Sequence, residues 1–178
     1  SLADEENGYH LIYFDFDNFK PYNDKYGFRN GDRLILMFAD LLKKAGFSDR
    51  RFVGHIGGDD FFMGIKGATT PDLEEEMRRL AMKFKTNAQS FYDAQTLENG
   101  FMIARDRDNI ERKMPLITVS TAILELPANQ ERNYTIEDAG NFISQLKKEA
   151  KKSDTGMALA DIRDFAAPEP PSLMSIPL

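Results

Sequence analysis

Two short apolar runs on either side of a glycine pair constrain the fold of this chain most. Residues 52–56 and 61–65 each have the length and apolar content of a β-strand, and Gly57 and Gly58 lie between them. Glycine readily adopts the positive φ angles that a two-residue hairpin loop requires. The segment 52–65 therefore predicts a β-hairpin whose loop is Gly57-Gly58.

Asp59 and Asp60 follow the glycines directly, so we expect the hairpin to present two adjacent carboxylates at an exposed tip. Adjacent carboxylates repel each other, and a divalent cation bound through oxygen ligands removes that repulsion. Magnesium together with phosphate oxygens is the partner that this pattern favours. The alternative is a turn without a ligand, because Asp is common in turns for conformational reasons alone.

A second acidic pair follows the apolar run 11–14. Asp15 and Asp17 are two residues apart, so their side chains point to the same face of an extended strand. A strand that ends in this way delivers two oxygen ligands at its carboxyl end. An ordinary strand end with acidic residues explains the pattern without a metal, but two acidic pairs in one short chain favour a metal site.

The segment between the two acidic pairs combines turn-forming residues with a helix. Residues 21–32 are rich in turn formers, and the apolar residues after them are at helical spacing: Leu34, Ile35, Phe38, Leu41 and Leu42. Asp32 then lies near a helix start, where N-capping explains it without any ligand. Asn23 has a similar local explanation as a turn residue.

Together, residues 15–32 and the segment Gly57-Gly58-Asp59-Asp60-Phe61 resemble the GGDEF domain of bacterial diguanylate cyclases. The two motifs occur in the order of that family, separated by about one helix and one strand. The resemblance implies an α+β fold of the palm-like nucleotidyl-cyclase type, with a central, mainly antiparallel sheet and flanking helices. It also implies a domain over residues 8–163. The prolines of segment 167–172 cannot continue a helix or a central strand, so we expect residues 164–178 to be a linker or disordered tail.

The resemblance further implies a reaction and a cofactor. Diguanylate cyclases of this family condense two GTP molecules to cyclic di-GMP and pyrophosphate, and each domain holds one GTP, so the expected catalytic unit is a homodimer. The metal ligands for Mg²⁺ or Mn²⁺ are then expected to be Asp15, the backbone carbonyl of Phe16, Asp59 and Asp60. Of these, Asp59 and Asp60 are the expected catalytic residues.

For substrate binding, the resemblance places Asn23 and Asp32 against the guanine edge. An Asp accepts hydrogen bonds from both the ring N–H and the exocyclic amine of guanine, which explains selection of GTP. The groups expected to bind the phosphates are the backbone amides of Asn18, Phe19 and Lys20 and the side chain of Lys151. Lys151 also has a local explanation, since lysines are favoured near helix ends.

The chain departs from the family pattern at several positions. Asp60 replaces the usual Glu, Phe28 a usual His, His55 a common Arg, and Lys147-Lys148 a Leu-Tyr pair. Two functions therefore remain open: an active cyclase, and a catalytically weak or inactive GTP-binding module that regulates an attached domain such as a cyclic di-GMP phosphodiesterase. A nucleic-acid polymerase palm fits the carboxylates but not the acidic charge of the chain.

Composition agrees with one domain. The 178 residues are 42% hydrophobic, which is enough for a single core, and no cysteine is present to form a disulfide. The formal net charge of −6 argues against broad binding to nucleic acid. No apolar run approaches the roughly 20 residues of a membrane span. We expect a cytoplasmic segment without membrane contact, within a larger multidomain signalling protein that is itself compatible with a membrane anchor.

The rest of the chain predicts five further elements. Thr70-Pro71-Asp72 indicates the start of a second helix, and residues 100–104 are expected to pair with residues 116–124 across a charged, solvated loop. Thr135 indicates the start of a third helix, followed by a last strand. The inward face of that third helix is expected to contain Ile136, Ala139, Ile143, Leu146 and Ala150.

Overall fold

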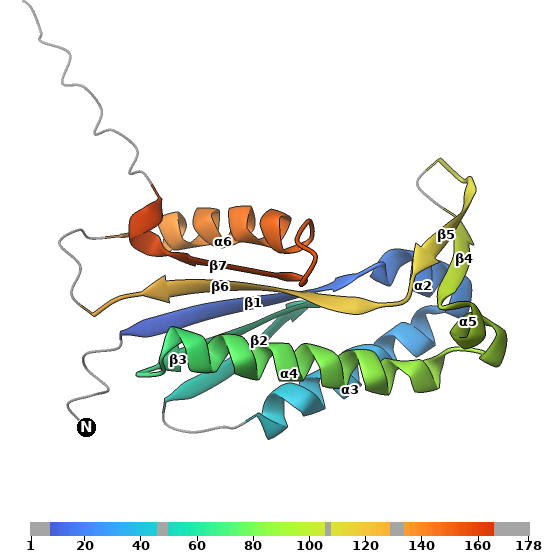
Figure 1. Ribbon diagram of the computed structural model, residues 1–178, viewed down its shortest axis with the longest axis horizontal. Coiled ribbons are helices and arrows are strands. Elements are labelled where there is room, and N and C mark those ends of the chain that lie inside the picture. The colour runs from blue at the N-terminus through green and yellow to red at the C-terminus, as the bar shows by residue number, and fades with distance from the viewer. Residues whose placement is uncertain (1–7, 46–49, 106–107, 129–133, 166–178) are drawn as a thin grey trace, which may run out of the picture.

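The computed structural model describes residues 8–45, 50–105, 108–128 and 134–165. Its centre is a five-stranded sheet in the order β2-β3-β1-β6-β7 (Figure 1). These strands are β1 Tyr9–Asp17, β2 Arg51–Gly57, β3 Asp60–Lys66, β6 Thr118–Leu126 and β7 Met157–Asp161. Neighbouring strands are antiparallel except for β6 and β7, which are parallel. The predicted α+β fold, with a mainly antiparallel central sheet, is confirmed.

Helices cover both faces of this sheet. Figure 1 shows α3 and α4 on one side and α6 on the other. The three helices are α3 Phe28–Lys44, α4 Thr70–Ala88 and α6 Ile136–Ala150. A smaller group of elements lies at one end of the molecule: α2 Phe19–Tyr26, α5 Ala94–Asn99, β4 Phe101–Arg105 and β5 Glu111–Pro115. Two short 3₁₀ turns, η1 Gln89–Phe91 and η2 Ile162–Asp164, complete the described elements.

The alternation of side chains along β1 decides what each face of the sheet carries. Phe14 and Phe16 are buried on the side of α3 and α4, whereas Asp15 lies between them on the side of α6. At the centre of the buried side is Phe38 of α3, which is fully buried. Its ring meets four others edge-on at centroid distances of 5.1–5.4 Å, those of Phe14, Phe16, Phe61 and Phe84. Edge-to-face packing of this kind adds to the stabilisation that burial gives each ring.

Two phenylalanines of the β2–β3 hairpin lie over glycines of the facing strand. Phe52 is the register partner of Gly64, and Phe62 is the partner of Gly54. A Cβ on Gly64 would come within 1.9 Å of the Phe52 ring, and a Cβ on Gly54 within 1.9 Å of the Phe62 ring. Only glycine leaves room for each ring, so this reciprocal arrangement helps to fix the register of the hairpin.

The segment predicted as turns before α3 is helical instead. Residues 19–26 form α2, because Tyr22 is buried and its hydroxyl donates to the carbonyl of Phe91 at 3.2 Å. Pro21 falls in the first turn of α2, where its missing N–H costs no hydrogen bond. Helix α3 then begins at Phe28 with Gly27 as its N-cap, so Asp32 lies one turn inside the helix. The interpretation of Asp32 as an N-cap is wrong.

Two further expectations are corrected. Strand β4 pairs with β5 and not with residues 116–124. Residues 118–124 belong instead to β6, which pairs with β1 along its whole length. Strand β6 is apolar on both faces, which suits a strand covered by helices on both sides better than a hairpin in solvent. Part of the expected charged loop is therefore strand β5. Ile136, expected to face inward, is the first residue of α6 and is 93% exposed.

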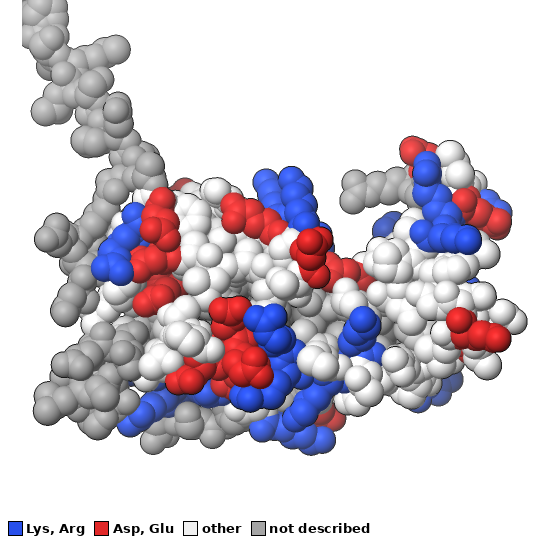
Figure 2. Space-filling view, viewed as in Figure 1, with Lys and Arg blue, Asp and Glu red and all other residues white. Residues whose placement is uncertain are grey.

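Charged side chains of both signs alternate over the surface around α4 (Figure 2). The helix follows an N-cap at Thr69, and Arg78 pairs with Glu74 at 2.7 Å on its exposed side. Exposed pairs at this spacing stabilise a helix by a few tenths of a kcal/mol each, about 0.2–0.5. Within the residues that the structure describes, no helix combines the length and hydropathy that crossing a membrane requires.

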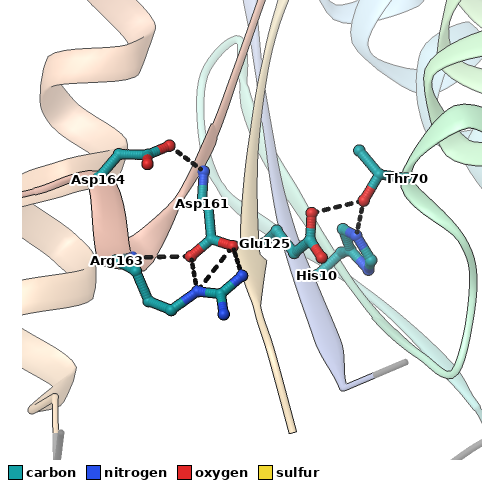
Figure 3. Close-up of polar contacts among 6 residues, drawn as sticks. All are labelled: His10, Thr70, Glu125, Asp161, Arg163 and Asp164. Atoms are coloured by element: carbon teal, nitrogen blue, oxygen red, sulfur yellow. Dashed lines mark hydrogen bonds and ion pairs between the residues drawn. The ribbon is translucent and has the colours of Figure 1, made fainter. Parts of the chain in front are cut away.

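A partly buried polar chain joins β1, the start of α4 and β6 (Figure 3). His10 Nε2 lies 3.0 Å from the hydroxyl oxygen of Thr70, and that hydroxyl donates to Glu125 Oε2 at 2.6 Å. Since the hydroxyl proton goes to Glu125, its oxygen accepts from Nε2–H of His10 and Nδ1 stays unprotonated. No described residue donates to Nδ1. Burial lowers the pKa of His10, although the nearby charge of Glu125 acts in the opposite direction.

This buried histidine predicts a loss of stability in mild acid. Because its pKa is lower in the folded state than in the unfolded state, the stability is complete above about pH 6.5 and falls as the pH drops below it. The loss is limited to about 1.4 kcal/mol per pH unit for one proton. Urea unfolding of wild type and His10→Gln between pH 7.5 and 5.5 is the measurement, and the variant is expected to lose less stability over that range.

The second histidine of the sequence, His55, supplies the control. His55 is exposed on β2, so His55→Gln is expected to keep the wild-type pH dependence. Equal pH dependence of wild type and His10→Gln would contradict the assignment of a neutral, buried His10.

Candidate active site

Two carboxylates face each other across neighbouring strands at one end of the sheet. Asp15 of β1 and Asp60 of β3 are direct register partners. The hairpin that carries Asp60 is confirmed, but its loop is Gly58-Asp59 and not Gly57-Gly58, because Gly57 still pairs with Asp60. Both glycines adopt positive φ angles, 153° and 56°, as the sequence predicted. Asp59 therefore occupies the tip of the hairpin, one residue from the facing pair.

Asp59 and Asp60 are half-buried rather than at an exposed tip. Burial raises the pKa of Asp59, and the charges of Asp15 and Asp60 raise it further. A backbone hydrogen bond and the charge of Lys151 act in the opposite direction. Three carboxylates thus lie close enough to interact electrostatically, which is an arrangement that a cation stabilises.

Two lysines from α6 neutralise these carboxylates. Lys151 Nζ lies 2.5 Å from Asp15 Oδ1. Lys147, one helical turn earlier, lies 3.3 Å from Asp15 Oδ2 and 3.2 Å from Asp60 Oδ1. Its ammonium group also lies over the ring of Tyr13, 4.0 Å from the centroid. Helix α6 therefore supplies two positive charges to an acidic site formed by β1 and β3.

The predicted acidic pair of β1, Asp15 and Asp17, does not act as a unit in the structure, because the two side chains have different hydrogen-bond and ion-pair partners. Asp17 does not join the carboxylate cluster, because its oxygens accept hydrogen bonds from the hydroxyls of Thr118 and Ser120, each at 2.7 Å. Asp15 joins it. The strand end thus contributes one carboxylate to the site and not the expected pair of ligands.

The chemistry of the donors suits a hard divalent cation, since Mg²⁺ and Mn²⁺ prefer carboxylate and carbonyl oxygens. The predicted ligands Asp15, Asp59 and Asp60 come together, and Phe16 follows Asp15 directly on β1. In the part of the chain that the structure describes, no three acidic, histidine or cysteine side chains enclose a common point as metal ligands do. Asp15 instead contacts Lys147 and Lys151, and Asp60 contacts Lys147.

The residues predicted to bind phosphates lie at the junction of β1 and α2. Asn18 adopts a left-handed conformation with φ 61° and precedes α2, so Phe19 and Lys20 are the first residues of that helix. The first N–H groups of a helix have no partner within the helix and favour anions. The side chain of Lys20 pairs with Asp24 at 2.7 Å on the exposed side of α2.

The residues predicted to read guanine lie where α2 and α3 meet. Asn23 is 8% exposed, and no described residue donates to its Oδ1. A Cβ on Gly31 of α3 would come within 1.9 Å of that oxygen, so a glycine at this position makes room for the amide. Asp32 follows Gly31 and is exposed. A buried amide oxygen without a hydrogen-bond partner is energetically costly.

Comparison with protein-family models shows to which family this chain belongs. The family model described as "Diguanylate cyclase, GGDEF domain" matches residues 1–114, more than half of the chain. The chain belongs to the GGDEF family. Its similarity to individual GGDEF proteins is more limited in extent. Diguanylate cyclase DgcS of Shewanella oneidensis is 43% identical over 58 residues, which is 32% of this chain and 19% of that protein.

Solved GGDEF structures share the fold of this chain. The GGDEF domain of DgcB from Caulobacter crescentus, in complex with c-di-GMP, aligns with a TM-score of 0.58 and 18% identity over 91% of this chain and 82% of that one. An EAL/GGDEF domain protein from M. capsulatus aligns with a TM-score of 0.54 and 25% identity over 86% and 84% of the two chains. The GGDEF sheet and its flanking helices thus extend over nearly all of the described residues.

Sequence reasoning missed Tyr13 and Lys147 as members of this GGDEF site. Tyr13 is two residues before Asp15 on β1, so the two side chains share a face. Lys147 is four residues before Lys151, so both lysines lie on one side of α6. These spacings are visible in the sequence, but the packing of α6 on β6 and β7, from which Lys147 reaches both Asp15 and Asp60, is not.

Proposed function

We propose that this GGDEF domain binds GTP with Mg²⁺ or Mn²⁺ and, as a homodimer, condenses two GTP molecules to cyclic di-GMP and pyrophosphate. The observation that supports this most is the convergence of Asp15, Asp59 and Asp60 beside Lys151 on one face of the sheet. The orphan amide oxygen of Asn23 supports a guanine site on the neighbouring helix pair. Each protomer contributes one GTP, so product formation requires two domains.

In the proposed reaction, the 3′-hydroxyl oxygen of one GTP attacks the α-phosphorus of the other. A new O–P bond forms, the bond to the β-phosphate breaks, and pyrophosphate leaves. The proton of the hydroxyl passes toward Asp59, directly or through a water molecule. A Mg²⁺ ion held by Asp15, Asp59, Asp60 and the carbonyl of Phe16 would stabilise charge on the phosphates. The same attack in the opposite direction closes the ring.

The phosphates of GTP are proposed to lie at the start of α2, against the amides of Asn18, Phe19 and Lys20. Lys151 is 43% exposed at its side chain, so its ammonium group has the freedom to move from Asp15 to a phosphate oxygen. For guanine, the carboxylate of Asp32 accepts from the ring N–H and from one N–H of the exocyclic amine. Asn23 Oδ1 accepts from the second N–H of that amine.

One substitution tests the guanine site. Gly31→Ala is expected to lower the affinity for GTP about tenfold, because the new Cβ displaces the Asn23 amide and a hydrogen bond to guanine is lost. Affinities for GTP and ATP are measured by isothermal titration calorimetry. The preference for GTP over ATP is expected to shrink in the variant.

Gly140→Ala is the matched control. Gly140 lies in α6, and a Cβ at this position would have no atom within 4 Å, so the substitution is expected to leave GTP affinity unchanged. Unchanged GTP affinity in Gly31→Ala as well would contradict the proposed position of the guanine.

The activity itself is tested by incubating the domain at high protein concentration with GTP and MgCl₂, followed by chromatography for cyclic di-GMP and the linear intermediate. Product whose rate rises more steeply than the protein concentration would support a dimeric cyclase. Saturable GTP binding without any product would instead support a regulatory module. Absence of GTP binding would exclude both.

A specific observation favours the regulatory module as the second candidate function. Asp60, at the position where the family usually has Glu, accepts a hydrogen bond from Lys147 at 3.2 Å. A carboxylate held by a lysine is less available to a metal ion than a free one. In this alternative, GTP binding shifts the conformation of an attached domain without turnover.

We also propose the setting of this domain. It is a cytoplasmic segment of a larger multidomain signalling protein, and the proposed domain boundary stays at residues 8–163. The proposed linker or tail is 164–178, of which residues 166–178 lie outside the described residues. The solved EAL/GGDEF protein from M. capsulatus supports the idea that an attached domain is the partner.

A further inference from the structure

Lys147 contacts two carboxylates and one aromatic ring of the site, although it lies outside the GGDEF motif. We propose that Lys147 is a resident cation that takes the place of a second divalent ion between Asp15 and Asp60, so that this site holds one metal ion. The proposal rests on the proposed metal-dependent function and adds to it the number of metal ions. It follows from the position, the packing and the charge of this side chain.

The position of Lys147 is that of a bridging cation. Its ammonium group lies 3.3 Å from Asp15 Oδ2 and 3.2 Å from Asp60 Oδ1, between two carboxylates on facing strands. Like charges in facing positions of neighbouring strands destabilise a sheet, so this pair requires a cation whether or not a metal is present. Lys147 supplies that cation from within the chain.

The packing of Lys147 keeps it in place. Its neighbour Leu146 is buried and anchors this turn of α6 on the sheet. The ammonium group lies 4.0 Å from the ring centroid of Tyr13, which attracts it in addition to the two carboxylates. The side chain is 24% exposed, compared with 43% for that of Lys151. The two lysines thus differ in exposure: Lys147 is largely enclosed, whereas Lys151 is the more accessible to a bound triphosphate.

The charges leave room for one divalent ion. Lys151 contacts one oxygen of Asp15, and Lys147 contacts the other. Within the described residues, no ion pair involves Asp59, whose carboxylate at the hairpin tip accepts a backbone hydrogen bond but contacts neither lysine directly. The three carboxylates carry a formal charge of −3 and the two lysines +2, so a single divalent ion beside Asp59 already brings the site to +1. A second ion would raise this positive charge further and would meet the ammonium group of Lys147 at close range.

The test measures metal binding directly and contains no nucleotide. Free Mn²⁺ is followed by electron paramagnetic resonance while the protein is titrated, in wild type and in Lys147→Met, which keeps the length of the side chain but removes its charge. Wild type is expected to bind one Mn²⁺. The variant is expected to bind Mn²⁺ about tenfold more tightly and to show a second bound ion.

Lys148→Met is the matched control, because Lys148 is the next residue of α6 and is exposed. It removes the same charge from the same helix and is expected to bind Mn²⁺ as wild type does. Equal Mn²⁺ binding by wild type and Lys147→Met would overturn the proposal, as would an equal gain in both variants. If circular dichroism shows that Lys147→Met does not fold, Lys147→Gln replaces it, with the same expected and contradicting results.

This design separates the inference from the proposed function. A wild-type domain that does not bind GTP would end the cyclase and the regulatory proposals, yet the Mn²⁺ titration would still report on Lys147. Conversely, a GTP-binding domain whose Lys147→Met variant gains no metal affinity would retain its function and lose only this inference.

Discussion

Replacement of Asp59 by Asn is expected to lower the rate of cyclic di-GMP formation at least about a hundredfold. The amide has the size of the carboxylate but neither accepts a proton nor carries the charge that a metal ion needs. Affinity for GTP is expected to change much less, because the guanine contacts lie on α2 and α3. The rate is measured by chromatography of the product, and the affinity by calorimetry.

The same substitution is expected to leave the fold as stable as before, or more stable. Burial and the charges of Asp15 and Asp60 raise the pKa of Asp59, which means that its ionised form is less favourable in the folded state than in the unfolded one. Asn removes this cost at pH 7. If Asp59→Asn keeps the wild-type rate, Asp59 has no role in the mechanism. If its melting temperature is much lower than that of wild type, the loss of activity is explained by a loss of folding.

The largest expected loss of stability comes from Phe38→Ala, at about 3–5 kcal/mol. Phe38 is fully buried and packs edge-on against four rings from β1, β3 and α4. The substitution removes a large apolar side chain and leaves a cavity that these neighbours fill only in part. Urea unfolding followed by circular dichroism gives the free energy of unfolding.

Phe28→Ala controls for the loss of a phenyl ring from the same helix. Phe28 begins α3 and is 75% exposed, so its removal is expected to change the free energy of unfolding by no more than about 0.5 kcal/mol. Similar losses in the two variants, or a loss below about 1 kcal/mol in Phe38→Ala, would show that the phenylalanine cluster is not the centre of the core.

The parts of this fold that sequence reasoning predicted are those set by local chemistry. The glycines before Asp59 indicated the hairpin, and the helix starts near Thr70 and Thr135 were visible from their capping residues. The error in the hairpin loop was one residue, because both glycines have positive φ angles and only the pairing of Gly57 with Asp60 decides between the two loops. Local signals therefore place an element better than they place its ends.

Contacts between distant segments account for the errors. Strand β5 contains Glu111, Arg112 and Lys113, so its composition is that of a loop, and its pairing with β4 alone makes it a strand. Residues 19–26 became a helix because Tyr22 is buried against the carbonyl of Phe91. In the site, the sequence identified the carboxylates of β1 and β3, whereas the contact between Lys147 and Asp60 joins residues 87 positions apart.

The alternation of phenylalanines and aspartates along β1 has a consequence for how this site can evolve. Phe14 and Phe16 enter the core while Asp15 meets the lysines of α6, so the chemistry and the core share one strand. A single inserted or deleted residue in β1 would exchange the two faces, placing a carboxylate among aromatic rings and a phenyl group against two ammonium ions. An insertion or deletion within β1 is therefore expected to disrupt the core and the carboxylate site together.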